Sequence, residues 1–253
     1  MDAEGLLPDD AEPPRIPYAE VGENLQPIVL LADSQVLFWQ PGGEPFLHRL
    51  RDGLPTPTPR AAYVGASNDD DPDAYRIFAG AMELAGIDRL RRIPSELSAA
   101  DLEWIDGAHL ILLAGGDLER GWRTFKANGL ARILVRRHGE GALLIGVSAG
   151  AVQLGLGGYV GAANGGERFL HTFALCHHVV GVHQEAEDWA PLERAVRELG
   201  GHVQGYGIPA GGGLLYHPDL TLEPLRRPVV ELRMSGREVD RQILLPAVEP
   251  PPS

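Results

Sequence analysis

One stretch decides how the rest of the chain is interpreted, and it reads Ala142-Leu143-Leu144-Ile145-Gly146-Val147-Ser148-Ala149-Gly150-Ala151. Its first part is apolar and uncharged, which predicts a buried strand that stops at Ser148. The small residues after Ser148 can start a helix directly behind it. A Gly-x-Ser-x-Gly pattern between strand and helix is typical of a nucleophile elbow, in which the serine occupies a strained, tight turn. The alternative is a glycine-rich turn with an incidental serine.

Short apolar runs alternate with helical patterns along the rest of the chain. Because these runs are apolar throughout, their strands are expected to be buried on both faces. The alternation with helices then predicts an α/β fold with a largely parallel sheet covered on both sides. The predicted strands are 27–31, 61–64, 108–113 and 142–147, the helices are 74–84, 121–137 (with Asn128-Gly129 as an interruption) and 189–199, and a C-terminal β-hairpin joins 229–234 to 242–245.

The two ends of the chain differ from its middle in composition. Residues 1–26 carry four prolines among several acids and predict an extended lead-in, and residues 246–253 form a Pro-rich tail. Single α/β domains commonly reach about 250 residues, so residues 27–245 are predicted to form one catalytic domain.

Composition excludes several classes of function. With 253 residues, 44% hydrophobic and 23% charged, the chain is neither disordered nor collagen-like. A net charge of −13 makes nucleic acid and anionic membrane poor partners. No apolar run approaches the ~20 residues of a membrane span, and the N-terminus lacks the pattern of a secretory signal, so a cytoplasmic location is expected. The single cysteine, Cys176, excludes an intramolecular disulfide and a cysteine-rich metal site.

A second glycine-rich loop follows the strand before the elbow. Gly115-Gly116-Asp117 comes directly after the predicted strand 108–113, and the ends of parallel strands meet at one edge of the sheet. Glycines there let a backbone N–H approach a substrate carbonyl, and with the N–H of Ala149 they would complete an oxyanion hole. The alternative is a simple turn, and no phosphate-binding glycine pattern follows a strand here.

A serine nucleophile needs a base, and histidine is the side chain suited to this role at neutral pH. Of the four histidines that follow the elbow within 35 residues, His183 is favoured because Val179-Val180-Gly181-Val182 resembles a strand that ends at the same sheet edge. His171, His177 and His178 are treated as structural. A metal site in this cluster is the less favoured alternative, because the spacing matches no strong ligand signature. Neither a metal nor another cofactor is predicted.

A third group is needed to orient the imidazole and stabilise its charge. Glu167 lies between the elbow and His183, after Asn164-Gly165-Gly166, and is the first choice. Glu185, Glu187 and Asp188 follow the histidine and remain alternatives. The turn Ala32-Asp33-Ser34-Gln35 after the first strand could line the site or serve only as a strand-end turn.

Together these motifs resemble the peptidase E and cyanophycinase family of serine peptidases. The resemblance covers residues 27–245 and is carried by the strand ending in Gly115-Gly116-Asp117, by the elbow 145–151 and by Gly207-Ile208-Pro209. The family shows a Pro-His pair where this chain has Val182-His183, at a similar distance from the serine.

This resemblance implies a three-layer α/β/α sandwich like that of class I glutamine amidotransferases, with serine in place of their cysteine. It implies that Ser148 attacks a peptide carbonyl, that His183 relays the proton, and that N–H groups near Gly116 and Ala149 hold the oxyanion. The expected substrate is a peptide or a peptide-like small molecule, and a homodimer is left open.

One departure from the family concerns specificity. Family members have arginines after the catalytic histidine that help select acidic substrates, whereas this chain reads Gln184-Glu185-Ala186-Glu187-Asp188. Gln184 and Glu185 are expected to contact substrate, and this carboxylate cluster would repel an aspartate side chain. We therefore expect a basic or neutral substrate group, or a free amino terminus, rather than strict Asp-X dipeptides.

Two other functions remain open from sequence. An esterase or acyl hydrolase of the α/β-hydrolase type also uses an elbow, but this chain lacks the upstream His-Gly-Gly loop of that fold. A catalytically inactive binding or regulatory protein on the same scaffold is the second alternative. Amidotransferase chemistry is disfavoured, because Cys176 lies outside any Gly-x-Cys-x-Gly context.

Overall fold

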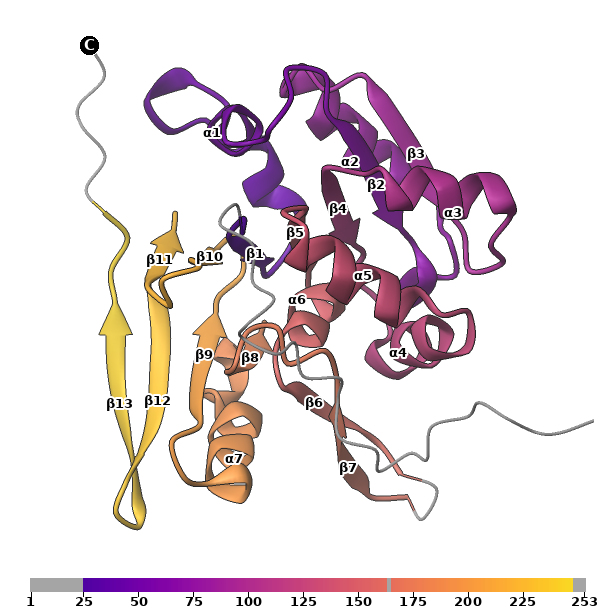
Figure 1. Cartoon of the computed structure of the whole chain (residues 1–253). Coiled ribbons are helices and arrows are strands. Elements are labelled where there is room, and N and C mark those ends of the chain that lie inside the picture. The colour runs from indigo at the N-terminus through magenta and orange to yellow at the C-terminus, as the bar shows by residue number, and fades with distance from the viewer. Residues whose placement is uncertain (1–24, 163–164, 248–253) are drawn as a thin grey trace, which may run out of the picture.

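The strand that leads to Ser148 lies in the middle of a mixed sheet (Figure 1). The computed structural model describes residues 25–162 and 165–247. Within these residues the central sheet has the strand order β11-β10-β1-β5-β4-β2-β3. Strands β1, β5, β4, β2 and β3 are parallel to one another, β10 pairs antiparallel with β1, and β11 pairs antiparallel with β10. Its strands are β1 (Ile28–Leu31), β2 (Arg60–Val64), β3 (Arg89–Ile93), β4 (Leu110–Leu113), β5 (Leu143–Val147), β10 (Gly213–Tyr216) and β11 (Leu222–Leu225).

The central strands are buried on both faces because successive side chains enter two different cores. In β1, Ile28 and Leu30 belong to one apolar cluster and Val29 and Leu31 to the other. The same alternation holds in β4 and β5, as the period of two in a strand requires. These two cores are the two interfaces of a three-layer α/β/α sandwich, so the predicted fold class is confirmed.

Helices cover both faces of this sheet. Buried residues of α1 and α2 contribute to one core, and those of α3, α4, α5 and α6 contribute to the other. The predicted interruption at Asn128-Gly129 is confirmed, since Gly129 has φ +81° and separates α4 from α5. The helices are α1 (Phe46–Asp52), α2 (Pro72–Leu84), α3 (Ala99–Asp106), α4 (Leu118–Ala127), α5 (Leu130–Gly139), α6 (Ala149–Leu154) and α7 (Ala190–Leu199), and the 3₁₀ helices are η2 (Ser34–Phe38), η3 (Pro41–Gly43), η4 (Ala66–Asn68) and η5 (Glu185–Glu187).

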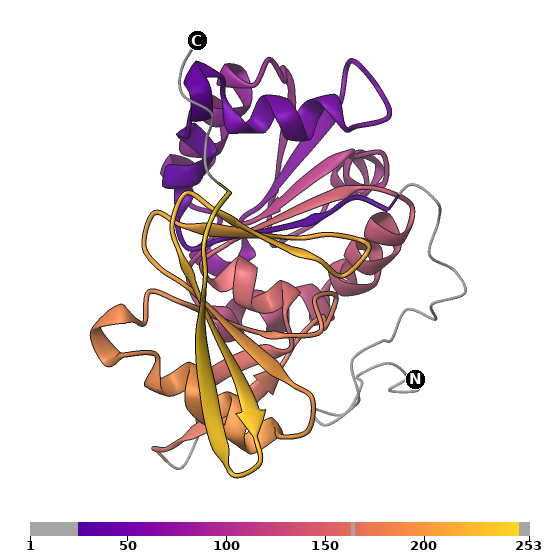
Figure 2. The same ribbon diagram turned by 90° about the vertical axis from the view of Figure 1, so that its left-hand side faces the viewer.

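A second, smaller sheet carries the C-terminal hairpin. Its order is β13-β12-β9-β8, formed by β8 (Val179–Val182), β9 (Gln204–Ile208), β12 (Val229–Ser235) and β13 (Glu238–Leu244). The predicted hairpin is confirmed and is the yellow pair that faces the viewer in Figure 2. Helix α7 packs on this sheet through a third apolar cluster that includes Trp189, Leu192 and Val196. The ribbon β6 (Gly157–Gly161) and β7 (Glu167–His171) projects from the end of α6 (Figure 1).

Strand β3 was not predicted from the sequence, because it is not an apolar run. It reads Arg-Leu-Arg-Arg-Ile and lies at the edge of the sheet, where charged side chains reach water. The predicted lead-in and tail lie almost wholly outside the described residues, and the assignment of 27–245 to one domain stays a prediction.

Candidate active site

Ser148 occupies the strained turn that joins β5 to α6. Its backbone has φ +51° and ψ −114°, a conformation that a residue with a side chain rarely adopts. The backbone N–H of Ser148 donates to the Leu31 carbonyl (2.8 Å), and its own carbonyl accepts from Ala151 N–H (2.9 Å). Strand pairing on one side and the first turn of α6 on the other therefore hold the strained backbone in place.

The two glycines of the elbow are required by close packing of backbone on backbone. A Cβ atom on Gly146 would lie closer than 3.0 Å to the Gly150 carbonyl, and one on Gly150 would meet the Leu113 carbonyl equally closely. The tight turn at Ser148 brings α6 back over β4 and β5, so no side chain fits at either position. The Gly-x-Ser-x-Gly spacing thus has the steric cause that the sequence indicated.

The loop after β4 lies directly against Ser148. A Cβ atom on Gly115 would be 3.0 Å from Cβ of Ser148, so only a hydrogen separates this loop from the serine. Gly116 has φ +131°, and a Cβ there would clash with the Ser67 carbonyl. Asp117 N–H donates to that same carbonyl (2.7 Å). The predicted loop therefore adjoins the serine, and η4 fixes its far end.

The polar groups of Asp117 form hydrogen bonds within the protein. Its carboxylate accepts from Arg120 N–H (2.7 Å) and caps α4, while its N–H is bound to Ser67. Backbone N–H groups at Gly115, Gly116 and Ala149 remain the candidate oxyanion donors. Ala149 is the first residue of α6, so its N–H has no acceptor within the helix.

Gln153 and Ser67 form a buried, hydrogen-bonded pair that supports this loop, and no sequence pattern indicates it. Gln153 of α6 donates through Nε2 to Ser67 Oγ (3.1 Å) and to the Leu118 carbonyl (3.2 Å). A Cβ atom on Gly121 would clash with both Ser67 and Gln153, so α4 can cross this pair only with a glycine there. The pair links the helix after Ser148 to the loop that faces it.

His183 follows β8 and reaches the same end of the central sheet. Its Nε2 lies 2.6 Å from the carbonyl oxygen of Ala32, which comes directly after β1. The preceding carbonyl, that of Leu31, binds Ser148 N–H. Consecutive carbonyls at the end of β1 thus contact His183 and Ser148. Within the described part of the chain no hydrogen bond joins the Ser148 hydroxyl to the His183 ring, a bond that often forms only with substrate present.

The structure does not bring Glu167 to His183. Glu167 is the first residue of β7, its side chain is 57% exposed, and its carboxylate accepts from Arg194 Nη2 (2.8 Å). Arg194 lies on α7 and also stacks over the ring of Tyr159. The assignment of Glu167 as the orienting acid therefore stays a prediction that these contacts do not support.

The residues after His183 shape the rim of the site. Gln184 accepts from Leu192 N–H through Oε1 (3.1 Å), so its side chain binds the first turn of α7, and its contact with substrate stays a prediction. Glu185 accepts from Ala210 N–H (2.6 Å), and Asp33 accepts from Gly211 N–H (2.7 Å). These two carboxylates hold the loop after β9 beside Ala32. Asp33 thus stabilises the rim, a use that the sequence left open.

Residues 58–217, well over half of the chain, match peptidase family S51. The chain belongs to this family. The resemblance to peptidase E and cyanophycinase is thereby confirmed, and the protein is a hydrolase, a serine-type peptidase.

Solved structures show the same fold at low sequence identity. A peptidase from an acI-B1 Actinobacterium superposes with a TM-score of 0.60 at 16% identity, over 88% of this chain and 96% of that one. A putative peptidase E protein from Listeria monocytogenes EGD-e gives a TM-score of 0.54 at 13% identity, over 83% and 99%. No curated protein matches the chain.

Cys176 and His178 are poor candidates for the chemistry of the peptidase. Cys176 is fully buried, and burial raises the pKa of its thiol to about 12. Burial likewise lowers the pKa of His178 to about 4, and its ring lies between those of Tyr206 and Tyr216. Among the described residues no three His, Cys, Asp or Glu side chains are placed to hold a metal ion, and none of the helices there is long and apolar enough to cross a membrane.

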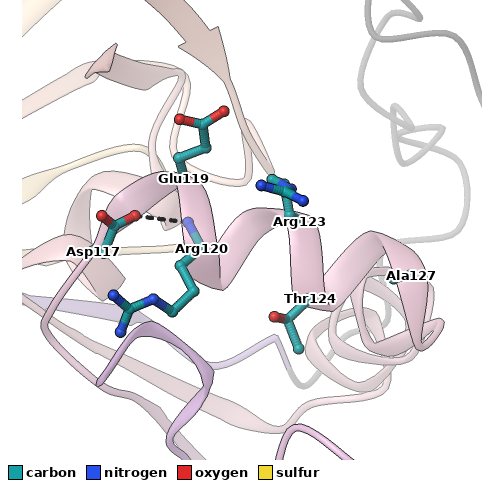
Figure 3. A pocket seen from close by; sticks show the side chains of 6 residues that line it. All are labelled: Asp117, Glu119, Arg120, Arg123, Thr124 and Ala127. Carbon is teal, nitrogen blue, oxygen red and sulfur yellow. Dashed lines mark hydrogen bonds between the residues drawn. The ribbon is translucent and has the colours of Figure 1, made fainter. Parts of the chain in front are cut away.

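Two cavities of the peptidase lie near the Gly115–Asp117 loop. The larger, about 470 Å³, follows α4 and is lined by Asp117, Glu119, Arg120, Arg123, Thr124 and Ala127 (Figure 3). Its charges are largely matched within the protein, since Arg120 pairs with Asp69 and Glu119 with Arg168. The smaller, about 170 Å³, is lined among others by Gly115, which lies against Ser148, and by Val147, the residue before it. The smaller cavity is therefore the one that adjoins the elbow.

Arg226 is a positively charged residue near the rim that was not predicted from the sequence. Arg226, between β11 and β12, donates to the Gly211 carbonyl (3.5 Å). It comes more than 40 residues after His183, so only the fold could bring it to this loop.

Proposed function

We propose that this S51 peptidase hydrolyses short peptides through an acyl-enzyme on Ser148, with His183 as general base and then general acid. The observation that carries the proposal is the strained Ser148 turn, which faces the Gly115 loop and shares the end of β1 with His183. Strained backbone at such a turn is a feature of nucleophile elbows.

His183 can act as a base through its other ring nitrogen. A carbonyl oxygen only accepts hydrogen bonds, so we assign the proton of neutral His183 to Nε2, which lies against Ala32. This leaves Nδ1 as an acceptor for the hydroxyl proton of Ser148. The Ala32 carbonyl then keeps the ring in one tautomer and faces the positive charge that forms on it, a role that a carboxylate often fills.

The reaction follows from these groups. Nδ1 of His183 takes the hydroxyl proton as Ser148 Oγ attacks the peptide carbonyl, and N–H groups of the Gly115–Gly116 loop and Ala149 stabilise the oxyanion. His183 next gives its proton to the leaving amine, and the acyl-enzyme forms. Water, activated by the same nitrogen, releases the acid and restores Ser148.

The rim of the site favours substrates without an acidic group there. Glu185 and Asp33 place two carboxylates beside Ala32 and His183, and a further carboxylate would be repelled by them. We propose neutral or basic short peptides, or a free amino terminus at this rim, in place of strict Asp-X dipeptides. A cytoplasmic location and a homodimer remain part of this proposal.

The experiment is mass-spectrometric profiling of a mixed short-peptide library with basic, neutral, acidic and isopeptide-linked members. The wild-type protein is compared with Ser148→Ala and with the matched variant Ser235→Ala, which lies at the distant turn of the C-terminal hairpin. Cleavage that is lost in Ser148→Ala alone supports the proposal. Cleavage that survives in Ser148→Ala contradicts it, and no cleavage by any protein favours an ester substrate or an inactive binding protein.

A further inference from the structure

We propose that the small cavity beside Ser148 is the subsite for the side chain of the residue whose carbonyl is attacked, and that it takes an uncharged apolar or aromatic side chain. This inference rests on the proposed role of Ser148. It goes further, because it names the chemical group that the peptidase selects on the acyl side of the scissile bond.

The first support is the position of the cavity. Gly115 and Val147 both line it, and Gly115 approaches Ser148 so closely that a Cβ atom there would be 3.0 Å from Cβ of the serine. Val147 is the residue before the serine. A substrate carbonyl at Ser148 Oγ would therefore lie next to two of the residues that line this cavity.

The second support is the face of the sheet on which the cavity lies. The apolar residues that line it, such as Leu37, Leu112 and Val147, belong to or pack against the cluster that faces α1 and α2. His183 contacts Ala32, which belongs to the other cluster, as does Val180 of the strand before His183. His183 and the cavity thus lie towards opposite faces of the central sheet. Because His183 must protonate the leaving amine, the cavity is left for the acyl half of the substrate.

The third support is the chemistry of the walls. The buried side chains of Leu37, Tyr63, Phe78 and Leu112 form the interior, and none of the residues that line the cavity carries a formal charge. Its volume of about 170 Å³ compares with about 150 Å³ for an apolar cavity that binds benzene. A Leu, Met or Phe side chain matches this space and these walls.

The polar groups of the cavity disfavour an anionic side chain. Asn68 donates through Nδ2 to the Tyr63 hydroxyl (2.8 Å), which uses one of the two N–H groups of that amide. Burial raises the pKa of Tyr63, the hydrogen bond from Asn68 lowers it, the carboxylates of Asp71 and Asp70 raise it, and the charge of Arg92 lowers it, with a net rise. The hydroxyl is therefore neutral and lies in a field that repels a carboxylate.

The test varies one side chain of the substrate and one wall of the cavity. Peptides that differ only in the acyl-side residue (Gly, Ala, Leu, Phe, Asp, Arg) are compared by kcat/KM. We expect Leu and Phe to exceed Gly and Asp at least 10-fold, since each buried methylene is worth roughly fourfold. Ala74→Leu fills the cavity from α2 and is expected to remove the preference for Leu and Phe over Ala.

A matched variant and a binding measurement separate the possible failures. Ala79→Leu makes the same change on α2 at a half-buried position that does not line the cavity, so it should keep the preference. Binding of N-acetyl-phenylalanine amide to the Ser148→Ala protein, followed by NMR, should weaken at least 10-fold in Ala74→Leu and stay unchanged in Ala79→Leu. No apolar preference, or a preference that Ala74→Leu leaves intact, overturns the subsite even if Ser148 proves catalytic. If no peptide is cleaved, the proposed function fails, and the binding measurement alone decides whether the cavity is an apolar site.

Discussion

The Nε2 atom of His183 lies 2.6 Å from the carbonyl oxygen of Ala32, one residue after the carbonyl that binds Ser148 N–H. The base and the nucleophile are therefore positioned by consecutive residues at the end of β1. His183 has φ +57° and Ser148 has φ +51°, so both residues adopt a backbone conformation that is costly outside glycine. Strain at two residues around one strand end is typical of a functional site.

The first prediction concerns Glu167. Because its carboxylate binds Arg194 and a backbone carbonyl contacts His183, we expect Glu167→Gln to keep kcat within about threefold. Stability should change by less than about 1 kcal/mol, since the ion pair is exposed. Steady-state kinetics of the purified variant check this. A triad acid is worth roughly 10⁴-fold in kcat, so a loss of that size would show that Glu167 orients the histidine.

The second prediction concerns Gly116. Its φ of +131° and the clash of a Cβ with the Ser67 carbonyl mean that Gly116→Ala must displace the loop that faces Ser148. We expect a loss of at least about 2 kcal/mol in the free energy of unfolding and a fall in kcat of about 100-fold or more from a displaced oxyanion donor. Urea unfolding and kinetics measure both.

The matched control for Gly116→Ala is Gly80→Ala on α2. Nothing lies within 4 Å of a Cβ atom at Gly80, so this helical site should gain about 0.5–1 kcal/mol with unchanged kcat. An active, stable Gly116→Ala protein would mean that the loop is not held as described.

The third prediction concerns the buried support of the loop. Gln153→Leu removes the donor to Ser67 Oγ and to the Leu118 carbonyl. It also removes Gln153 Oε1, which is buried without a hydrogen-bond partner, so the expected loss of stability is only about 1 kcal/mol. Since the loop loses its anchor, kcat should fall more than KM rises. Gln242→Leu on the exposed strand β13 is the control, and equal kinetics in the two variants would argue against a positioning role for Gln153.

The fourth prediction is a pH dependence of stability. Burial lowers the pKa of His178 to about 4 from 6.5, and it does the same for His138. Below pH 6.5 the unfolded chain binds a proton on each histidine that the folded chain does not, so stability is lost as the pH falls from 6.5 to 4. The loss is on the order of 3 kcal/mol for each histidine. His178→Phe should remove about half of this dependence in urea unfolding followed across that range.

A control for the pH experiment is His202→Gln, because that side chain is exposed. It should leave the pH dependence of unfolding unchanged. An unaltered slope in His178→Phe would show that the ring between Tyr206 and Tyr216 is protonated in the folded protein.

Much of the fold and part of the site follow from sequence, because buried parallel strands are apolar throughout. The elbow at Ser148 and the Gly115–Asp117 loop come directly after strands of the central sheet. His183 follows β8, which belongs to the smaller sheet and not to the central one as the sequence predicted, and it reaches the end of β1 through its contact with Ala32. Glu167 had no such signal. It lies on the ribbon β6–β7, which the sequence did not predict, and that ribbon brings it to Arg194.

Other features have no local signature at all. Ser67 and Gln153 are 86 positions apart and meet only in the fold. The Ala32 carbonyl is a backbone group, so its contact with His183 cannot be predicted from the type of residue at position 32. The apolar cavity is assembled from η2, α2 and three strand ends, each of which looks like ordinary core in sequence.

The most direct measurement of the central claim is the site of covalent modification by a fluorophosphonate, mapped by peptide mass spectrometry. The account predicts a single adduct on Ser148, which is absent in Ser148→Ala and forms at least 100-fold more slowly in His183→Ala. An adduct on another serine, or labelling of Ser148 at the same rate without His183, would contradict it.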